Sequence, residues 1–245
     1  MKPVDTHCHL DFEAFDEDRK EVIDRCGERL EFVVNAGREP ESNRKSIELE
    51  EENDCVVANL GLHPTHTGSF DEIDTVKQQV REHDPAAVGE IGLDHHHVTD
   101  PDTRNRQEEV FRQMLELARE LQKPVVVHSR DAESRAVEIL EEFTEDVMLH
   151  CFNGTADLAE RAAGNGMYIG VTTQVLYSNR VQQIAEKIPL DRLLLETDSP
   201  FLYRGERNEP ANVEESAEKI AELKGLNVEE VIRSTTASAS RLFGR

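Results

Sequence analysis

The segment DTHCH at residues 5–9 places two imidazole side chains two positions apart near the amino terminus. Its apolar neighbours Val4 and Leu10 indicate a short buried strand, on which side chains two residues apart point to the same face. His7 and His9 would then project together and supply half of a metal site. A single His-x-His pair also occurs in ordinary cores and surfaces, so this interpretation depends on further acidic and imidazole residues.

Side chains of the same chemical kind lie in or after other apolar segments. They are His63 after residues 55–60, Glu90 within 86–94, His128 after 125–127, His150 after 147–149 and Asp198 after 193–197. Buried carboxylates and imidazoles are costly unless each is paired, hydrogen-bonded or bound to a metal. A purely structural role would require a separate polar niche for each residue, whereas one shared centre would satisfy them together.

The elements that would position these residues alternate between short apolar strands and amphipathic helices. We expect strands at 3–10, 32–37, 55–60, 86–94, 125–129, 147–152, 167–172 and 193–198. We expect helices at 16–30, 41–53, 73–80, 103–123, 133–143, 156–163, 181–188, 213–223 and 228–243. Nearly continuous apolar strands that alternate with helices are typical of a parallel sheet buried on both faces.

Eight such units in 245 residues predict the fold. A (β/α)8 TIM barrel of the α/β class typically has about 250 residues, so we expect a single domain spanning residues 1–245. An open doubly wound sheet would carry a glycine-rich phosphate loop, and no G-x-G-x-x-G or G-x-x-x-x-G-K-[ST] motif occurs. In a barrel the carboxyl ends of all strands meet at one face, which would unite the candidate residues.

The composition narrows the class of protein. No apolar run approaches the roughly 20 residues of a membrane helix, and no secretory segment precedes the first strand, so we expect a cytoplasmic protein without a membrane anchor. The four cysteines lack C-x-x-C spacing, which favours free thiols over a zinc ribbon or a disulfide scaffold.

With 51 acidic and 28 basic residues, the formal net charge is -23. Acidity spread over helix faces in this way predicts a halophilic protein of a salt-rich cytoplasm.

Six motifs span nearly the whole chain in a specific order. They are DTHCHLD at 5–11, GLHP at 61–64, GEIGLD at 89–94, HSR at 128–130, HCFNG at 150–154 and LETDSP at 195–200. On these motifs the chain resembles the TatD-family metal-dependent hydrolases, a branch of the amidohydrolase-like barrel superfamily. The resemblance implies a TatD-type deoxyribonuclease, of the 3′–5′ exonuclease kind, that uses two divalent metal ions and a nucleic acid substrate.

The resemblance also implies roles for the predicted metal ligands. His7 and His9 would hold one ion together with Asp198, His128 and His150 would hold the second, and Glu90 would bridge the two. Oxygen and nitrogen ligands without cysteine suit Mg²⁺, Mn²⁺ or Zn²⁺. Two ions about 3.5 to 4 Å apart would activate a hydroxide for attack on phosphorus, with Asp198 and Glu90 as the catalytic carboxylates.

Substrate contacts follow from the same resemblance. Asp198 would accept or relay the proton of the attacking water, while Arg130 or His63 would steady the phosphate charge. A later loop supplies three more candidate phosphate contacts, Arg204, Arg207 and Asn208.

Some features depart from the family pattern, and two other functions stay open. The run at 95–97 is His-His-His where the family tends to have aromatic residues, and we expect an exposed polar loop there. The same centre could hydrolyse an ester or amide, as in an aminoacyl-tRNA deacylase or a cyclic amidohydrolase. A non-catalytic partner-binding protein on the same scaffold would be favoured by an incomplete ligand set. We expect a monomer or weak oligomer that acts on DNA.

The net charge of -23 predicts an unusual dependence on salt. Repulsion between the acidic surface and DNA reaches across about 10 Å at roughly 0.1 M salt but only about 3 Å at about 1 M, whereas short contacts at the centre are screened much less. Catalytic efficiency on single-stranded DNA should therefore rise with salt before it levels. The titration is to be restricted by circular dichroism to salt concentrations at which the protein is folded. A steady decline within that range, as for ordinary basic nucleases, would contradict the prediction.

Overall fold

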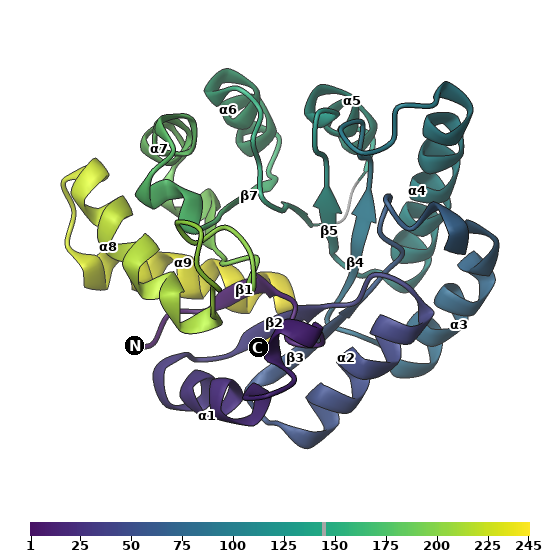
Figure 1. Ribbon diagram of the computed structural model, residues 1–245. Coiled ribbons are helices and arrows are strands. Elements are labelled where there is room, and N and C mark those ends of the chain that lie inside the picture. The colour runs from purple at the N-terminus through teal and green to yellow at the C-terminus, as the bar shows by residue number, and fades with distance from the viewer. Residues whose placement is uncertain (144–145) are drawn as a thin grey trace.

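The computed structural model describes residues 1–143 and 146–245. Its central element is one sheet of eight parallel strands that follow one another in sequence order and curve into a barrel (Figure 1). The strands are β1 (Asp5–Cys8), β2 (Val33–Ala36), β3 (Val56–Leu60), β4 (Ala87–Gly92), β5 (Val125–His128), β6 (Val147–Leu149), β7 (Tyr168–Val171) and β8 (Leu193–Leu195). The expected (β/α)8 TIM barrel of the α/β class is confirmed.

Helices cover the outside of the barrel (Figure 1). They are α1 (Arg19–Arg29), α2 (Pro40–Glu52), α3 (Ile73–His83), α4 (Pro101–Leu121), α5 (Glu133–Leu140), α6 (Ala156–Gly164), α7 (Asn179–Lys187), α8 (Val213–Lys224) and α9 (Val228–Phe243). Short 3-10 helices lie in the connecting segments, at Glu13–Phe15, Thr67–Glu72, Thr173–Leu176, Leu190–Arg192 and Pro210–Asn212. The start of α4 has the clearest signal in the sequence. The side chain of Asp100 accepts a hydrogen bond from the backbone N–H of Thr103, and Pro101 occupies the first turn.

The amino-terminal end of the barrel is filled with apolar side chains. One buried cluster contains inward-facing residues of the strands together with the end of α9, among them Val34, Val57, Val126, Met148, Tyr168, Leu194, Leu242 and Phe243. Alternate strand residues such as Val33 and Val56 belong to a second cluster, in which the strands pack against the surrounding helices. Because this end is closed by α9, polar side chains can gather only at the opposite, carboxyl-terminal end of the strands.

The barrel closes between β1 and the segment that follows β8. Cys8 forms a parallel bridge with Ser199, and the N–H of His9 donates to the carbonyl oxygen of Ser199 at 2.8 Å. The N–H of Asp198 donates to the carbonyl oxygen of His7 at 2.9 Å. These backbone contacts hold His7 and His9, from the beginning of the chain, beside Asp198, from near its end.

Most strands end before the residue that the sequence predicts, and β6 and β8 fall furthest short of it. β6 stops at Leu149 and β8 stops at Leu195, so His150 and Asp198 lie just beyond the strands. The φ angles of Cys151 (45°) and Asp198 (57°) lie in the left-handed region, which is incompatible with an extended strand. The physical reason for the early ends is therefore a turn of the backbone at the site itself.

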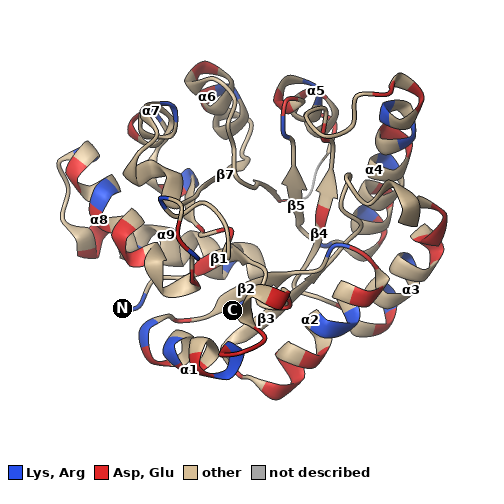
Figure 2. Ribbon diagram, in the orientation of Figure 1, with Lys and Arg blue, Asp and Glu red and all other residues tan. Residues whose placement is uncertain are grey.

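The outer surface carries the acidic side chains, which are spread over the helices (Figure 2). Several of them neutralise arginines, as Glu108 does with Arg112 at 2.8 Å and with Arg135 at 2.7 Å. None of the helices in the described ranges has the length and apolar character needed to cross a membrane.

The closure of the barrel predicts a large stability effect at one buried threonine. The carboxylate of Asp5 accepts hydrogen bonds from the backbone N–H of Thr197 at 2.8 Å and from its hydroxyl at 2.6 Å, all fully buried. Thr197→Val would leave an oxygen of Asp5 without its donor, so we expect the free energy of unfolding to fall by about 1–3 kcal/mol. Denaturant unfolding measures it, with the exposed Thr75→Val as control, expected within about 0.5 kcal/mol of the parent. Equal effects of the two substitutions would contradict a role in closure.

Candidate metal centre

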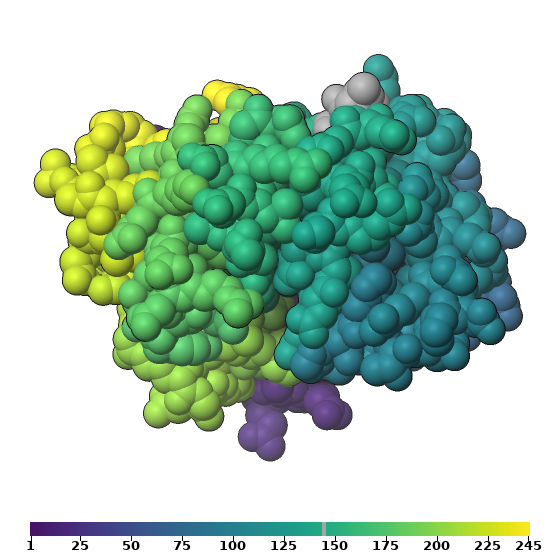
Figure 3. Space-filling model, turned by 90° about the horizontal axis from the view of Figure 1, so that it is seen from above, coloured from purple at the N-terminus to yellow at the C-terminus, as the bar shows by residue number. Residues whose placement is uncertain are grey.

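The predicted ligands meet in a pocket of about 730 Å³ at the carboxyl ends of the strands. Figure 3, turned by 90° from Figure 1, shows the outer wall of the barrel, where green and teal segments form most of the surface and the purple amino-terminal segment appears only at the lower edge. Seven of the predicted site residues line the pocket, namely His9, His63, Glu90, His128, Arg130, His150 and Asp198. His7 lies below them and is fully buried.

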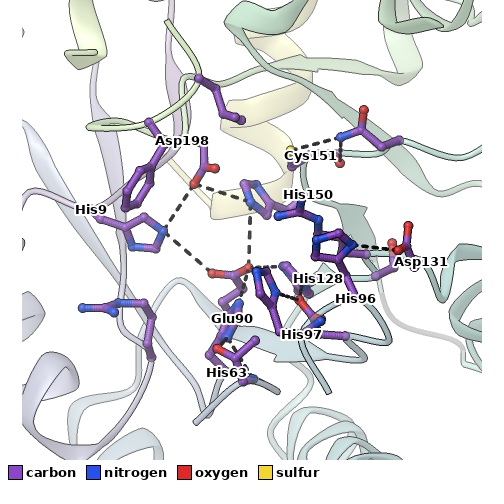
Figure 4. Close-up of a pocket in the computed structure, with 18 of the residues that line it drawn as sticks. His9, His63, Glu90, His96, His97, His128, Asp131, His150, Cys151 and Asp198 are labelled. Carbon is purple, nitrogen blue, oxygen red and sulfur yellow. Dashed lines mark hydrogen bonds and ion pairs between the residues drawn. The ribbon is translucent and has the colours of Figure 1, made fainter. Parts of the chain in front are cut away.

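Glu90, on β4, lies at the centre of these residues (Figure 4). Its Oε2 atom is 3.4 Å from Nε2 of His7 and 3.9 Å from Nε2 of His9. Its Oε1 atom faces three other imidazole nitrogens, those of His128 at 3.0 Å, His63 at 3.3 Å and His150 at 3.8 Å. The two oxygens of one buried carboxylate therefore face two different sets of histidines.

Asp198 is the second carboxylate of the centre. Its Oδ1 atom is 3.4 Å from Nε2 of His9, 3.7 Å from Nε2 of His150 and 4.0 Å from Nε2 of His7. The Nε2 atoms of His7 and His9 are 3.3 Å apart, which agrees with the same-face projection predicted from their spacing. His150 stands between the two sets, because it faces both Asp198 and Glu90.

Three of the four predicted imidazole ligands are held from behind by an acceptor. The contacts are Nδ1 of His9 with the carbonyl oxygen of Ala36 at 3.1 Å, Nε2 of His128 with Asp94 at 2.9 Å, and Nδ1 of His150 with Glu196 at 2.8 Å. An acceptor at the outer nitrogen fixes the tautomer, so that the inner nitrogen presents its lone pair. The inner nitrogens of all three point at Glu90 or Asp198.

Glycines make room for the two buried glutamates. A Cβ atom at Gly170, on β7, would lie 2.5 Å from Oε1 of Glu196, and one at Gly61 would lie 2.5 Å from the carbonyl oxygen of Glu90. Real Cβ atoms do not come so close to other atoms, so any larger residue would displace a carboxylate or its backbone. Glycine is therefore required at these two positions by the neighbouring glutamates, and not by the backbone conformation of a turn.

Burial and charge divide the titrating groups into two kinds. Burial lowers the pKa of His7 to about 3 and that of His63 to about 4, so both rings are neutral, as metal ligands must be. Burial alone would raise the pKa of Glu90 and of Asp198, but the surrounding histidines outweigh it and hold both below their ordinary values. Both carboxylates are thus ionised across the physiological range.

His128 and His150 behave in the opposite way. Burial alone would lower their pKa values, but the hydrogen bonds that His128 donates to Asp94 and Glu90 raise its pKa to about 9. The charge of Glu196, followed by that of Glu90, raises the pKa of His150 to about 10. Without a cation in the centre, these two rings therefore hold protons that neutralise the carboxylates.

The donor set fits a divalent cation. Donor atoms of His7, His9 and Asp198 lie within 4.8 Å of one another, as do those of His63, Glu90 and His128. Nitrogen and oxygen donors in such groups suit Mg²⁺, Mn²⁺ or Zn²⁺. The outward nitrogens of His9, His128 and His150 already face acceptors, so their inward nitrogens can bind a cation once they carry no proton. The residues present can therefore hold a metal without rearranging the barrel.

Some of the predicted substrate contacts line the pocket and the others lie outside it. His63 and Arg130 line the pocket. Arg204 lies outside its lining, half-exposed and 4.0 Å from Glu215. The other two also lie outside. Arg207 binds Asp18 at 2.6 Å, and Asn208 is fully buried, where its amide donates to Thr173, Thr197 and Phe201.

The histidine run at residues 95–97 forms part of the wall of the pocket. His96 and His97 line it and remain 46% and 54% exposed, in agreement with the exposed loop expected from the sequence. Nδ1 of His96 is 2.9 Å from Asp131, and Nδ1 of His97 is 3.0 Å from Asp94. Since Asp94 also holds His128, the run is tied to the metal centre through one carboxylate.

Several residues of the site were not predicted from the sequence. Asp94 and Glu196 orient ligands, and Cys151 and Arg38 line the pocket. For Asp94 and Glu196 a signal was present, because both lie in motifs that contain a ligand. The residue that each would orient depends on which strands are neighbours, and this required the structure. Arg38 follows β2 in no recognisable motif.

Comparisons with known proteins agree with this site. Residues 4–244 match the family model of TatD related DNase. A relative from Bacillus subtilis, the uncharacterized metal-dependent hydrolase YabD, is 39% identical over 98% of this chain and 98% of its own. The chain belongs to the TatD family. It is accordingly a metal-dependent hydrolase, as its sequence motifs predict.

Two further TatD proteins extend the comparison. The crystal structure of YJJV, a TatD homologue from Escherichia coli K12, superimposes with a TM-score of 0.87 at 27% identity, over 99% of this chain and 98% of that one. A protein of Citrobacter koseri named 3′-5′ ssDNA/RNA exonuclease TatD is 29% identical over 98% of both chains. Similarity along the whole length includes both the barrel and the pocket at its mouth.

The raised pKa values predict that metal binding by this TatD protein releases protons. His128 and His150 are protonated at about pH 7 in the metal-free protein, and a cation requires them neutral. The proton competes with the metal, so affinity should increase as pH rises from about 7 to about 10, the higher of the two pKa values, and then level. Isothermal titration calorimetry in buffers of different ionisation enthalpy should give about two protons released per protein at about pH 7. Affinity that does not change with pH in this range would contradict it.

Proposed function

We propose that this TatD-family hydrolase is a deoxyribonuclease that cleaves phosphodiester bonds of DNA with two divalent metal ions. The observation that carries the proposal is the division of imidazoles around Glu90, with His7 and His9 at one oxygen and His63, His128 and His150 at the other. A carboxylate placed in this way can bridge two cations. His7, His9 and Asp198 would hold one, His128 and His150 the other.

The chain's own groups account for the remaining chemistry. Divalent ions in such a pair lower the pKa of a water molecule and neutralise charge on the attacking and leaving oxygens. Asp198 is 16% exposed and Glu90 only 2%, so Asp198 is the carboxylate that a substrate and a water molecule can reach. We assign to Asp198 the acceptance of the proton of the attacking water. Glu90 stays ionised and holds the histidines in place.

Cationic groups beside the centre favour a phosphate over a neutral ester. Arg130 and Arg180 line the pocket. Within the described part of the chain, the guanidinium of Arg130 forms no ion pair, although many other arginines face a carboxylate. A free guanidinium beside a metal centre suits the equatorial oxygens of a phosphodiester. The name of the Citrobacter relative adds support for a nucleic acid substrate and a 3′–5′ exonuclease.

A substrate panel tests the proposal. Protein loaded with Mg²⁺, Mn²⁺ or Zn²⁺ is to be assayed on single-stranded DNA, RNA, a chromogenic phosphodiester and an aminoacyl ester. We expect cleavage of the DNA, and a label at either end distinguishes release of single nucleotides from internal cuts. Hydrolysis of the aminoacyl ester without cleavage of any phosphodiester would overturn the proposal and favour the ester or amide hydrolase.

Two substitutions test the roles of the carboxylates. Glu90→Gln should remove most of the bound metal and lower kcat by about a thousandfold or more, because both cations lose their shared ligand. Asp198→Asn should lower kcat comparably but keep the ion held by His128 and His150. Elemental analysis measures the metal, circular dichroism the fold, and the exposed Glu51→Gln serves as the charge-matched control. Full metal content in folded Glu90→Gln would exclude the bridge.

A further inference from the structure

An exposed aromatic side chain lies at the edge of the pocket beside His9. Phe201 is 45% exposed and is one of only three large hydrophobic residues found exposed in the described part of the chain. Its ring stands perpendicular to that of Phe12, with centroids 5.3 Å apart, and the centroid of His9 is 6.5 Å away. Phe12 and Phe201 both line the pocket. A large apolar ring is thus kept in solvent at the entrance to the metal centre.

Phe201 is held in this exposed place by hydrogen bonds of its backbone. Its N–H donates to the carbonyl oxygen of Asp198 at 2.9 Å, and its carbonyl oxygen accepts the amide of Asn208 at 2.8 Å. The same amide of Asn208 donates to the carbonyl oxygen of Thr197 at 3.0 Å. The ring therefore has a fixed position relative to Asp198. Asn208, predicted to bind phosphate, instead positions the segment that carries Phe201.

A partly buried cation lies over the ring of Phe12. The guanidinium of Arg38 stacks on this ring, with its carbon 4.2 Å from the centroid, and one of its nitrogens is 3.3 Å from Asp11. Its Nε is buried and has no hydrogen-bond partner among the described residues. The carbonyl oxygen of Arg38 accepts the N–H of His63 at 2.8 Å, which fixes the arginine to the wall of the pocket.

We propose that Phe12, Arg38 and Phe201 form a subsite for the nucleotide that neighbours the scissile phosphate. Phe201 stacks on its base, and Arg38 binds its phosphate while Phe12 supports the guanidinium. Stacking on an exposed aromatic ring suits any base that is unpaired, and an anchored guanidinium with free N–H groups suits a phosphate oxygen. The subsite rests on the proposed function, because it assumes that a nucleic acid enters the pocket.

Paired changes in protein and substrate test each contact. Phe201→Leu and Arg38→Met are compared with the parent on a single-stranded trinucleotide, on trinucleotides with an abasic site on either side of the scissile phosphate, and on one with a neutral methylphosphonate at the neighbouring linkage. Arg44→Met is the matched control, since Arg44 is an exposed arginine of α2 outside the pocket and its loss changes the net charge equally. Values of kcat/KM give the coupling between each side chain and each substrate group.

We expect Phe201→Leu to lower kcat/KM on the intact trinucleotide by about 10-fold, within the roughly 5- to 150-fold range of base stacking. With one of the two abasic substrates this loss should disappear. Arg38→Met should lose about 10-fold or more, a loss that persists on the abasic substrates and disappears on the methylphosphonate. Arg44→Met should cost the same small factor on every substrate.

Losses that do not depend on the substrate group would overturn the subsite, because they would show an effect on the fold or the metal centre. A parent protein that cleaves no oligonucleotide would instead contradict the proposed function. In that case the anisotropy of a fluorescein-labelled trinucleotide still tests the subsite. Equal affinity of the parent, Phe201→Leu and Arg38→Met would then exclude it.

Discussion

The buried carboxylate of Glu90 is the charge on which the arrangement of the barrel mouth depends. An ionised carboxylate removed from water is unstable unless cations or hydrogen-bond donors surround it. Imidazoles arrive from the ends of β1, β3, β5 and β6, and they are the groups that hold its pKa low. A parallel barrel is suited to this task, because it brings the ends of distant segments to one place. The apolar layer at the opposite end and α9 keep that framework rigid.

Two carboxylates, Asp94 and Glu196, form a second layer of polar groups behind the histidines. This layer also determines which residue is possible at a position outside the pocket. Asp94 and Glu196 turn the rings of His128 and His150 toward Glu90, and each is itself fully buried. Glu196 needs Gly170 on the neighbouring strand, since a larger residue would collide with its carboxylate. A glycine inside β7 is therefore a consequence of the metal centre, although it lies one strand away from any ligand.

Sequence patterns predicted those features of the fold and the site that follow from local periodicity. The spacing of His7 and His9 predicted their common face, and the alternation of strands and helices predicted the barrel. Asn208 shows the limit, because its polar type suggested a phosphate contact while its burial gives it a backbone-holding role. Burial depends on long-range packing that spacing does not encode. The positive φ angle of Asp198 is similarly invisible in a strand-like sequence, and it moves this residue beyond β8.

The acidic surface and the arginines of the pocket act over different distances. Outside the pocket, many arginines are neutralised locally, as Arg135 is by Glu108 and Arg161 by Glu141, so the uncompensated acidic groups set the long-range field. Inside it, Arg38 and Arg130 line the wall, and Arg130 forms no ion pair with the described residues. A polyanion lying along the surface would be repelled, whereas a chain end that enters the pocket exchanges this repulsion for short contacts with arginine. Salt weakens the first effect more than the second, because screening acts on charges separated by solvent. For the proposed nuclease, this charge distribution would favour a flexible chain end over a rigid duplex.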